Sequence, residues 1–267
     1  MRKLSILALV LAAVFTLGSA NAAALDNKYL EYNLSNSCPA DDTSGNNYDG
    51  TCNGGVQTGV SGIYGDAYNF TGDGYLDTGQ SYSGTDISIS AWVKFQKGYN
   101  FDHNNPDLFS EDSDEMIFGG YDGSNQIRLA YSAKGNELDF YTYDGSKHGV
   151  EYNWTNEVQA DTWYHIVGIY DSSITEYRLY INDTQVASAS DSTFALPTYD
   201  NYVGAGKRDS GAYKPFNGTI DQFKVFSDAL TDSEVNQLYT EASSDSGNSN
   251  PSLSTPSPSD GSSSVST

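Results

Sequence analysis

The chain is poor in the residues that build metal–thiolate and metal–imidazole sites. Only two cysteines and three histidines occur among its 267 residues. They are scattered along the chain, and no group of them has the spacing of a zinc site. The composition therefore argues against a zinc-stabilised fold and against zinc-dependent chemistry.

Positive charge is also scarce. The chain holds 13 lysines and arginines against 35 aspartates and glutamates, which gives a formal net charge of −22. Nucleic acids and anionic membrane surfaces would both be repelled by a protein of this charge. We therefore expect no nucleic-acid partner, whereas binding of cations is compatible with the composition.

Long apolar runs are missing everywhere except at the N-terminus. Arg2 and Lys3 precede an apolar run that ends near Leu17, and Ala20-Asn21-Ala22 has the small-x-small pattern of a cleavage site. This pattern predicts a signal peptide over residues 1–22. The run is shorter than the roughly 20 residues of a membrane span, which favours cleavage over an uncleaved anchor. We expect a secreted or cell-surface protein whose mature chain does not insert into a membrane.

The residues that are abundant favour β-structure. The 21 tyrosines and 26 glycines suit many short strands joined by tight turns. The clearest alternation lies in residues 86–95, where one face is apolar and the other carries Ser88, Ser90, Trp92 and Lys94. Residues 67–70 and 75–76 are predicted to form a strand and its returning partner around a turn at 71–74.

Residues 216–239 predict the last strand and a single helix. Over residues 220–226, alternation places Asp221, Phe223 and Val225 on one face, so Asp221 would border a core-facing row and need a partner. Thr231 and Glu234 form a capping box for a helix that ends near residue 242. The sequence thus predicts an all-β protein, an antiparallel β-sandwich of the jelly-roll type with one short C-terminal helix.

Residues 243–267 consist mainly of Ser, Pro, Asp, Gly and Asn, with almost no apolar residue. A segment of this composition cannot bury a core, so we expect a disordered tail.

The two cysteines, Cys38 and Cys52, enclose a polar loop. An even pair in an exported protein predicts a disulfide. In the chain-entropy picture, closing a loop of this size stabilises the fold by roughly 3 kcal/mol.

Several of these stretches resemble laminin-G-like domains of the concanavalin A-like lectin/glucanase superfamily. The resemblance lies in the segments DTSGNNYDG (42–50), GIYGDAYNFTGDGY (62–75), ISISAWVK (87–94), WYHI (163–166) and NGTID (217–221). It implies one domain over residues 23–242, acting as a non-catalytic module that recognises a glycan or an extracellular glycoprotein. A structural or adhesive unit without a small ligand is the alternative. The residues that would contact a ligand are not assigned by the sequence.

A hydrolase is the third alternative, because the superfamily includes retaining glucanases. Those enzymes resemble one another in an E-x-D-x-E strand whose alternation gathers the carboxylates on one face. The only comparable cluster here, EDSDE at 111–115, has Ser113 at its centre and no apolar flanks, so we expect a non-catalytic loop. For His165, no Ser or Cys nucleophile can be placed nearby, and we expect a packed, hydrogen-bonded strand histidine.

The resemblance also implies a structural calcium ion. In related jelly rolls such an ion ties the loop after the first strand to an acid at the start of the last strand. The matching ligands are Asp42, Asn47 and Asp221, and they offer the oxygen atoms that calcium prefers. The alternative is that backbone N–H groups of the loop satisfy Asp221 without a metal.

Overall fold

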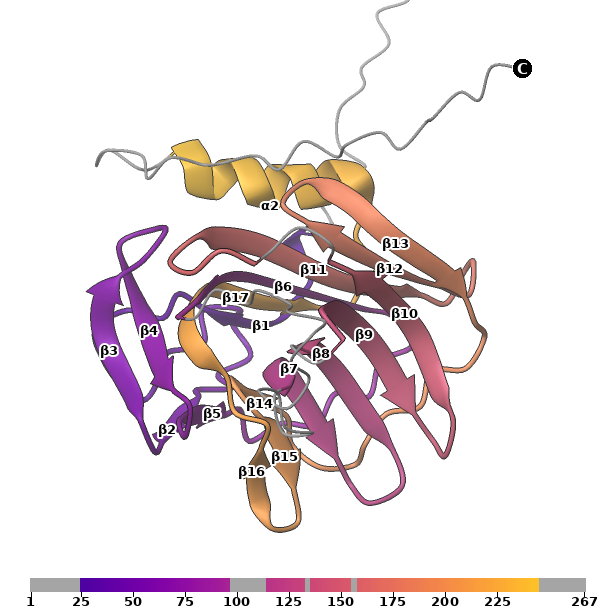
Figure 1. Cartoon of the computed structure of the whole chain (residues 1–267), viewed down its shortest axis with the longest axis horizontal. Helices are drawn as coiled ribbons and strands as arrows, with labels where there is room; N and C mark the ends of the chain where they lie inside the picture. Colours follow the sequence, from indigo (N-terminus) through magenta and orange to yellow (C-terminus); the bar gives the residue numbers. More distant parts are fainter. Residues whose placement is uncertain (1–24, 97–113, 133–134, 155–157, 245–267) are drawn as a thin grey trace, which may run out of the picture.

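The computed structural model describes residues 25–96, 114–132, 135–154 and 158–244, and in them two β-sheets pack face to face (Figure 1). Sheet 1 has the order β13 (Thr184–Ser190), β12 (Glu176–Ile181), β11 (Trp163–Asp171), β6 (Ile87–Phe95), β17 (Asn217–Phe226), β4 (Asp66–Thr71) and β3 (Val56–Ser61), and β1 (Lys28–Tyr32) also pairs with β17. Sheet 2 has the order β10 (Lys147–Asn153), β9 (Glu137–Tyr143), β8 (Gln126–Ser132), β7 (Asp114–Tyr121), β14 (Tyr202–Val203), β5 (Tyr75–Asp77) and β2 (Thr51–Asn53). Beside β7 lies a hairpin of β15 (Gly206–Arg208) and β16 (Gly211–Tyr213). The predicted antiparallel sandwich with one short helix is confirmed.

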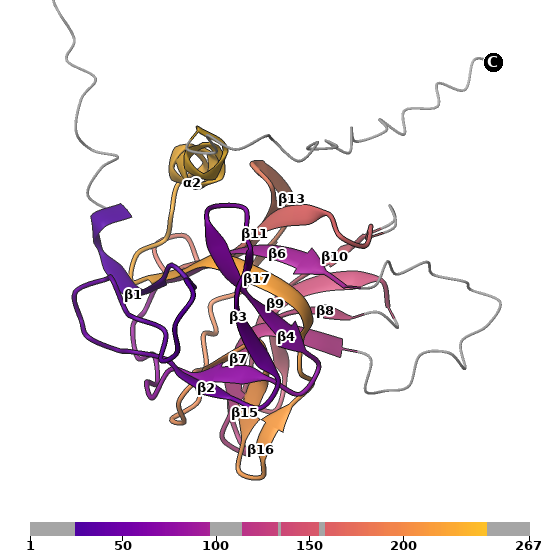
Figure 2. The same ribbon diagram turned by 90° about the vertical axis from the view of Figure 1, so that its left-hand side faces the viewer.

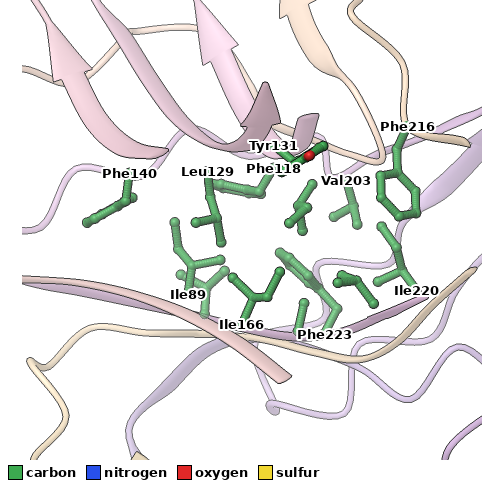
Figure 3. Close-up of a cluster of buried hydrophobic side chains, with 14 of the residues drawn as sticks. Ile89, Phe118, Leu129, Tyr131, Phe140, Ile166, Val203, Phe216, Ile220 and Phe223 are labelled. Carbon is green, nitrogen blue, oxygen red and sulfur yellow. The ribbon is translucent and has the colours of Figure 1, made fainter. Parts of the chain in front are cut away.

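The core fills the space between the sheets (Figure 3). Ile89, Ile166 and Phe223 of sheet 1 face Leu129 and Phe140 of sheet 2, and all five side chains are fully buried. Each buried side chain of this kind contributes roughly 1.5–3 kcal/mol relative to an exposed one. The inward row predicted for β6 is confirmed, since its apolar residues all belong to this core.

Helix α2 (Asp232–Ser244) lies across the outer face of sheet 1 (Figures 1 and 2). Val235 packs there against a cluster that includes Ile169 and Phe226. The predicted capping box is present, because Glu234 Oε2 accepts a hydrogen bond from Thr231 N at 2.7 Å and Glu234 N donates to Thr231 Oγ1 at 3.4 Å. The helix extends two residues beyond the predicted boundary at 242. No helix among the described residues is long and apolar enough to cross a bilayer.

The turn after β4 does not return the chain to its own sheet, so the predicted pairing of residues 67–70 with 75–76 is wrong. β4 pairs with β3 and β17 in sheet 1, whereas β5 pairs with β2 and β14 in sheet 2. Gly72 has a φ of +85°, and a Cβ on Gly74 would lie 2.6 Å from the Gly55 carbonyl carbon. This close backbone approach turns residues 71–74 into a corner between the two sheets.

The last strand contains a β-bulge that overturns the predicted face of Asp221. Asp221 pairs with Trp92, the register then shifts, and Lys224 pairs with Ser90. Gln222 is the extra residue and has a φ of +49°. Since a bulge reverses the alternation beyond it, Phe223 points into the core while Asp221 and Lys224 both lie on the outer face.

The acidic cluster at 111–115 is corrected in part. Asp114 and Glu115 open strand β7 rather than lying in a loop. Asp114 is ion-paired with Arg128 at 2.7 Å and with Lys214, which offsets the cost of placing a carboxylate in a sheet. Residues 111–113, the predicted signal peptide and the tail beyond Ser244 lie outside the described residues.

Candidate functional site

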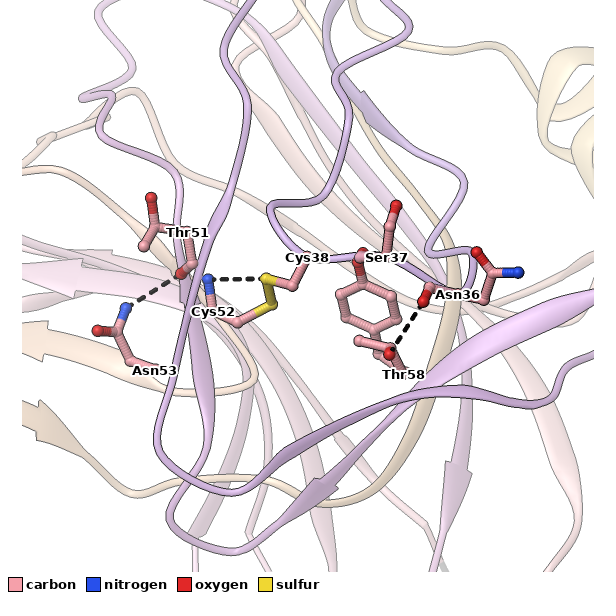
Figure 4. Close-up of a disulfide and its surroundings, with 8 residues drawn as sticks. Asn36, Ser37, Cys38, Thr51, Cys52, Asn53 and Thr58 are labelled. Atoms are coloured by element: carbon pink, nitrogen blue, oxygen red, sulfur yellow. Dashed lines mark hydrogen bonds between the residues drawn. A yellow bond between two sulfur atoms is a disulfide. The ribbon is translucent and has the colours of Figure 1, made fainter.

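The disulfide between Cys38 and Cys52 is confirmed, with the two Cα atoms 6.1 Å apart (Figure 4). Inside the loop, Ala40 and Gly50 exchange two backbone hydrogen bonds of 2.8 Å. The loop starts after β1 of sheet 1, and Cys52 lies in β2 of sheet 2. The disulfide therefore fixes a connection between the sheets at one end of the sandwich.

Asp42 organises the loop through four hydrogen bonds to its carboxylate. Oδ1 accepts from the backbone N–H groups of Glu31 and Ser44, both at 3.0 Å. Oδ2 accepts from Tyr48 N at 2.9 Å and from the Ser44 hydroxyl at 2.8 Å. Burial acts to raise the pKa of Asp42, but these donors outweigh it and hold the pKa below its usual value. Asn47 is exposed, with a left-handed φ of +59°.

Asp221 is fully buried and accepts hydrogen bonds from a different part of the chain. Its Oδ2 accepts from Ile63 N at 2.9 Å and Tyr64 N at 3.0 Å, and its Oδ1 accepts from Gln222 N at 2.7 Å. Ile63 and Tyr64 belong to the turn between β3 and β4, not to the disulfide loop. Burial raises the pKa of Asp221 to about 7 although the three N–H donors act to lower it.

The structure does not bring the three predicted calcium ligands together. Asp42 bridges to Tyr32, and Tyr32 in turn pairs with Phe223, so β1 lies between the loop and β17. The backbone of Asp42 therefore lies two strand spacings, or about 10 Å, from the backbone of β17. Within the described ranges, no three His, Cys, Asp or Glu residues cluster as metal ligands do. Calcium binding stays a prediction.

The packed histidine predicted at position 165 is confirmed. Its ring is buried and stacked on Trp92, with 5.2 Å between ring centroids. Nδ1 lies 3.3 Å from the Asn182 carbonyl oxygen, which can only accept, so Nε2 accepts the hydrogen bond from Ser90 Oγ at 2.8 Å. Alternation placed Ser90 and Trp92 on one face, but no local pattern in the sequence indicates that Ser90 lies beside His165. Ser90 is only 2 % exposed, and it lines the same cavity as His165 and Trp92.

The outer face of sheet 2 has a different character, because no described helix covers it (Figure 1). We call it the tyrosine face, and its residues are Tyr75, Asp77, Asp114, Tyr121, Gln126, Arg128, Asp139, Tyr141, Tyr202, Lys207, Arg208 and Tyr213, together with Asp200 beside Lys207. They stand on the side of their strands opposite to the core, or on the adjoining hairpin.

One end of the tyrosine face is a stacked pair of rings next to an ion cluster. Tyr75 and Tyr202 are 4.3 Å apart between centroids, with an interplanar angle of 17°. Lys207 Nζ lies 5.1 Å from the Tyr202 ring centroid and 3.2 Å from Asp200 Oδ2. Asp77 Oδ2 is 4.0 Å from the same ammonium group. Flat apolar rings and fixed charged groups are thus held side by side.

The hairpin β15–β16 supplies a second aromatic group. Arg208 is exposed, and its guanidinium carbon lies 4.1 Å from the Tyr213 ring centroid and 5.3 Å from that of Tyr121. The hairpin turns through Gly211, whose φ of +107° suits glycine. Sequence reasoning missed this hairpin, and the available signal was the Asp209-Ser210-Gly211 turn between residues that can form strands.

The centre of the tyrosine face is a rigid ion pair. Arg128 binds Asp139 in a bidentate manner, with N···O distances of 2.8 and 2.9 Å, and lies 5.5 Å from the Tyr141 ring centroid. Arg128 and Asp139 are both buried. Bidentate pairs of this kind combine strength with fixed geometry. The face is therefore preorganised rather than mobile in its polar groups.

The comparisons with known proteins agree with this architecture. Residues 70–236 match the protein family described as the concanavalin A-like lectin/glucanases superfamily. The chain belongs to this superfamily. The match leaves out β1 and the disulfide loop, so the predicted calcium ligand Asp42 lies outside it. No curated protein matches the sequence.

Two kinds of solved structure share the superfamily fold of this chain. Domain 4 of AbnA, an extracellular GH43 arabinanase from Geobacillus stearothermophilus solved with arabinotriose, has a TM-score of 0.62 and 20% identity over 80% of this chain and 98% of that one. The botulinum neurotoxin serotype D binding domain has a TM-score of 0.60 and 17% identity over 84% of this chain and 53% of that one. The toxin ligand binding domain in complex with N-acetylneuraminic acid gives 0.55 and 16%, over 82% and 52%. This chain thus spans about half of the toxin chains, and at these identities the likeness shows the fold alone.

Proposed function

We propose that this protein is an extracellular, non-catalytic module that binds a glycan on the tyrosine face. The carrying observation is the stacked pair Tyr75–Tyr202 beside the Lys207–Asp200 ion pair. Apolar ring faces pack against the C–H faces of a sugar, while charged planar groups exchange hydrogen bonds with its hydroxyls. Tyrosine supplies this contact area at low cost in conformational entropy.

Two observations from relatives support a sugar ligand over other partners. The arabinanase domain was solved with arabinotriose, and the toxin ligand binding domain with N-acetylneuraminic acid. The formal charge of −22 disfavours nucleic acid in the same position. Extracellular placement is supported by the disulfide, which is rare in reducing compartments.

The state of the carboxylates supports the non-catalytic part of the proposal. A retaining glycosidase places a nucleophile and an acid/base about 5–5.5 Å apart around the scissile bond. On the tyrosine face, Asp139 and Asp114 are held by Arg128, and Asp77 and Asp200 by Lys207. Carboxylates bound in this way serve to position cations and hydroxyls rather than to attack a sugar.

The test is retention of the protein on immobilised polysaccharides and on a glycan array that includes arabinan and sialylated glycans. Wild type should be retained by at least one glycan. Tyr75→Ala and Arg208→Ala should each lower the affinity for that glycan about 3- to 10-fold, as expected for the loss of one ring contact or cation.

The control is Ile174→Ala, which removes an exposed apolar side chain from the turn between β11 and β12 of sheet 1 and should leave this affinity unchanged. If no glycan retains the wild type, the protein is a structural or adhesive unit and the proposal is wrong. Equal retention of wild type and Tyr75→Ala would instead move the site away from the tyrosine face.

A further inference from the structure

A cavity of about 380 Å³ lies in the outer face of sheet 1, beside the C-terminal part of α2. Tyr64 from the β3–β4 turn, Trp92 from β6 and Lys224 from β17 contribute to its lining. A volume of this size suits one small molecule, since ligand pockets measure about 300–1,000 Å³. The cavity is separate from the tyrosine face, which belongs to the other sheet.

The β-bulge in β17 lies in the wall of this cavity. Gln222 is a non-glycine residue with a left-handed φ of +49°, a conformation that is costly unless its surroundings enforce it. The extra residue lets Asp221 and Lys224 share the outer face while Phe223 keeps its place in the core. Gln222 itself lines the cavity. Backbone strain is therefore concentrated where the cavity wall is formed.

The buried carboxylate of Asp221 positions one side of the cavity. It accepts the N–H groups of Ile63 and Tyr64, so it fixes the turn that carries the Tyr64 ring. A Cβ at Gly62 would lie 2.4 Å from Asp221 Oδ2, and Gly62 N donates to Gly65 O at 2.9 Å. The Tyr64 side chain is 42 % exposed at the cavity, although its backbone is held rigidly. An exposed ring on a fixed turn is a ready surface for a ligand.

Lys224 retains donors that can face a ligand. Its Nζ lies 3.6 Å from Glu31 Oε1, which is beyond hydrogen-bond length. The other oxygen of Glu31 already accepts from Lys28 Nζ at 2.7 Å and from Thr43 Oγ1 at 3.0 Å. Glu31 lies next to two ammonium groups, and its single charge cannot balance both. The ammonium of Lys224, whose side chain is 14 % exposed, therefore keeps capacity for another anion.

The floor of the cavity is aromatic and uncharged. Trp92 contacts both His165 and Tyr239, at centroid distances of 5.2 and 5.4 Å, and those two rings are 6.1 Å apart. Burial lowers the pKa of His165 to about 3, so the ring is neutral at physiological pH. The charged and titratable groups that face the cavity from its other walls are Glu31, Lys224 and Glu241, with Asp221 buried behind the turn.

We propose that this cavity is a second binding site, for a single sugar or hydroxy acid that carries a carboxylate. The carboxylate pairs with Lys224, the ring or carbon chain packs on Tyr64, and hydroxyls reach the side-chain amides of Gln222 and Asn33 at the cavity wall. The proposal goes beyond glycan binding on the tyrosine face and does not depend on it. It also gives Asp221 a role as a positioning residue that needs no metal.

The test is titration of the full chain with sodium glucuronate, with glucose as the uncharged counterpart, followed by NMR shifts and calorimetry. Wild type should bind glucuronate and bind glucose at least tenfold more weakly. Lys224→Met keeps the apolar stem and should lower the glucuronate affinity about tenfold or more, the usual effect of losing a charge-assisted hydrogen bond. Tyr64→Ala, at an exposed position that the fold tolerates, should lower it about 3- to 10-fold.

Lys94→Met is the matched control, because Lys94 lies on the same outer face but over Trp163, at 5.0 Å from its ring centroid. It should bind glucuronate as wild type does, and so should Tyr75→Ala on the other sheet. Absence of glucuronate binding to wild type would overturn the proposal. So would a wild-type affinity for glucuronate in both Lys224→Met and Tyr64→Ala. Glucuronate binding that is lost in Tyr75→Ala would place the ligand on the tyrosine face instead.

Discussion

The two outer faces of the sandwich show how the same strand periodicity serves two purposes. On sheet 1 the outward residues Val167, Ile169 and Phe226 are apolar and lie under α2. On sheet 2 the outward residues are tyrosines and ion pairs, and no described helix lies over them. An apolar outward row gains free energy only when another element covers it, whereas aromatic and charged rows can remain at the surface and meet a ligand.

The largest expected effect comes from removing the cover of sheet 1. Val235→Asp places a carboxylate in the apolar contact between α2 and the sheet, where Val235 is fully buried. We expect the free energy of unfolding to fall by about 3 kcal/mol or more, measured by urea denaturation. Ser233→Asp, two residues earlier on the exposed side of the helix, should change it by less than about 0.5 kcal/mol. Equal stability of the two variants would show that α2 does not hold the sheet.

A smaller effect should follow from Asp221→Asn, which tests the bulge under the same face. The amide cannot accept all three N–H groups, so we expect a loss of about 1–3 kcal/mol. Burial raises the pKa of Asp221 from 3.8 to about 7, so the native state binds more protons than the unfolded chain between these values. The contribution of Asp221 to stability should therefore fall as the pH rises from about 4 to about 7. Parallel pH profiles of unfolding for wild type and variant would contradict this.

Calcium binding at the end of the sandwich is a further prediction that belongs to neither face. If the disulfide loop holds an ion through Asp42, an excess of ten to a hundred times the dissociation constant should stabilise the protein by about 1–3 kcal/mol. Melting temperatures in calcium and in EDTA should then differ, and Asp42→Asn should remove the difference. Identical melting curves in both solutions would contradict calcium binding and would mean that Asp42 stabilises the loop through its hydrogen bonds alone.

The smallest effect concerns the edge where the two sheets meet. His148 of β10 lies between Asp191 at 2.9 Å and Asp144 at 3.0 Å, and these contacts raise its pKa above 6.5. A raised histidine pKa gives stability that is complete below about pH 6.5 and is lost as the pH rises through the native value. His148→Ala should flatten that part of the pH profile, while Glu151→Gln on the same strand should not. A wild-type profile without a slope there would contradict the prediction.

Local chemistry was sufficient to predict the elements whose partners are close in sequence. The capping box of Thr231 and Glu234 spans one helical turn, and the alternation of β6 follows from a pleat that is regular over nine residues. The Cys38–Cys52 pair needed only the parity of cysteines in an exported chain. The superfamily could be recognised because its short motifs recur in order along the chain.

The candidate sites were less accessible to such reasoning. The tyrosine face joins β5, β7, β8, β9, β14 and the β15–β16 hairpin, which are far apart in sequence, and no local pattern says which outward rows remain uncovered. Likewise, the alternation around Ser90 could not reveal His165, because the two residues meet only through the pairing of β6 with β11.

The clearest division between sequence and tertiary structure lies in β17. The sequence by itself determined that residues 220–226 form a buried strand followed by a capped helix. Only the tertiary structure decided that β17 pairs with β4 up to Ile220 and with β1 from Phe223 onward. The bulge at Gln222 lies where the neighbouring strand changes, and it reverses the alternation between Asp221 and Phe223. A change of partner is a non-local event, so periodicity along one strand cannot contain it.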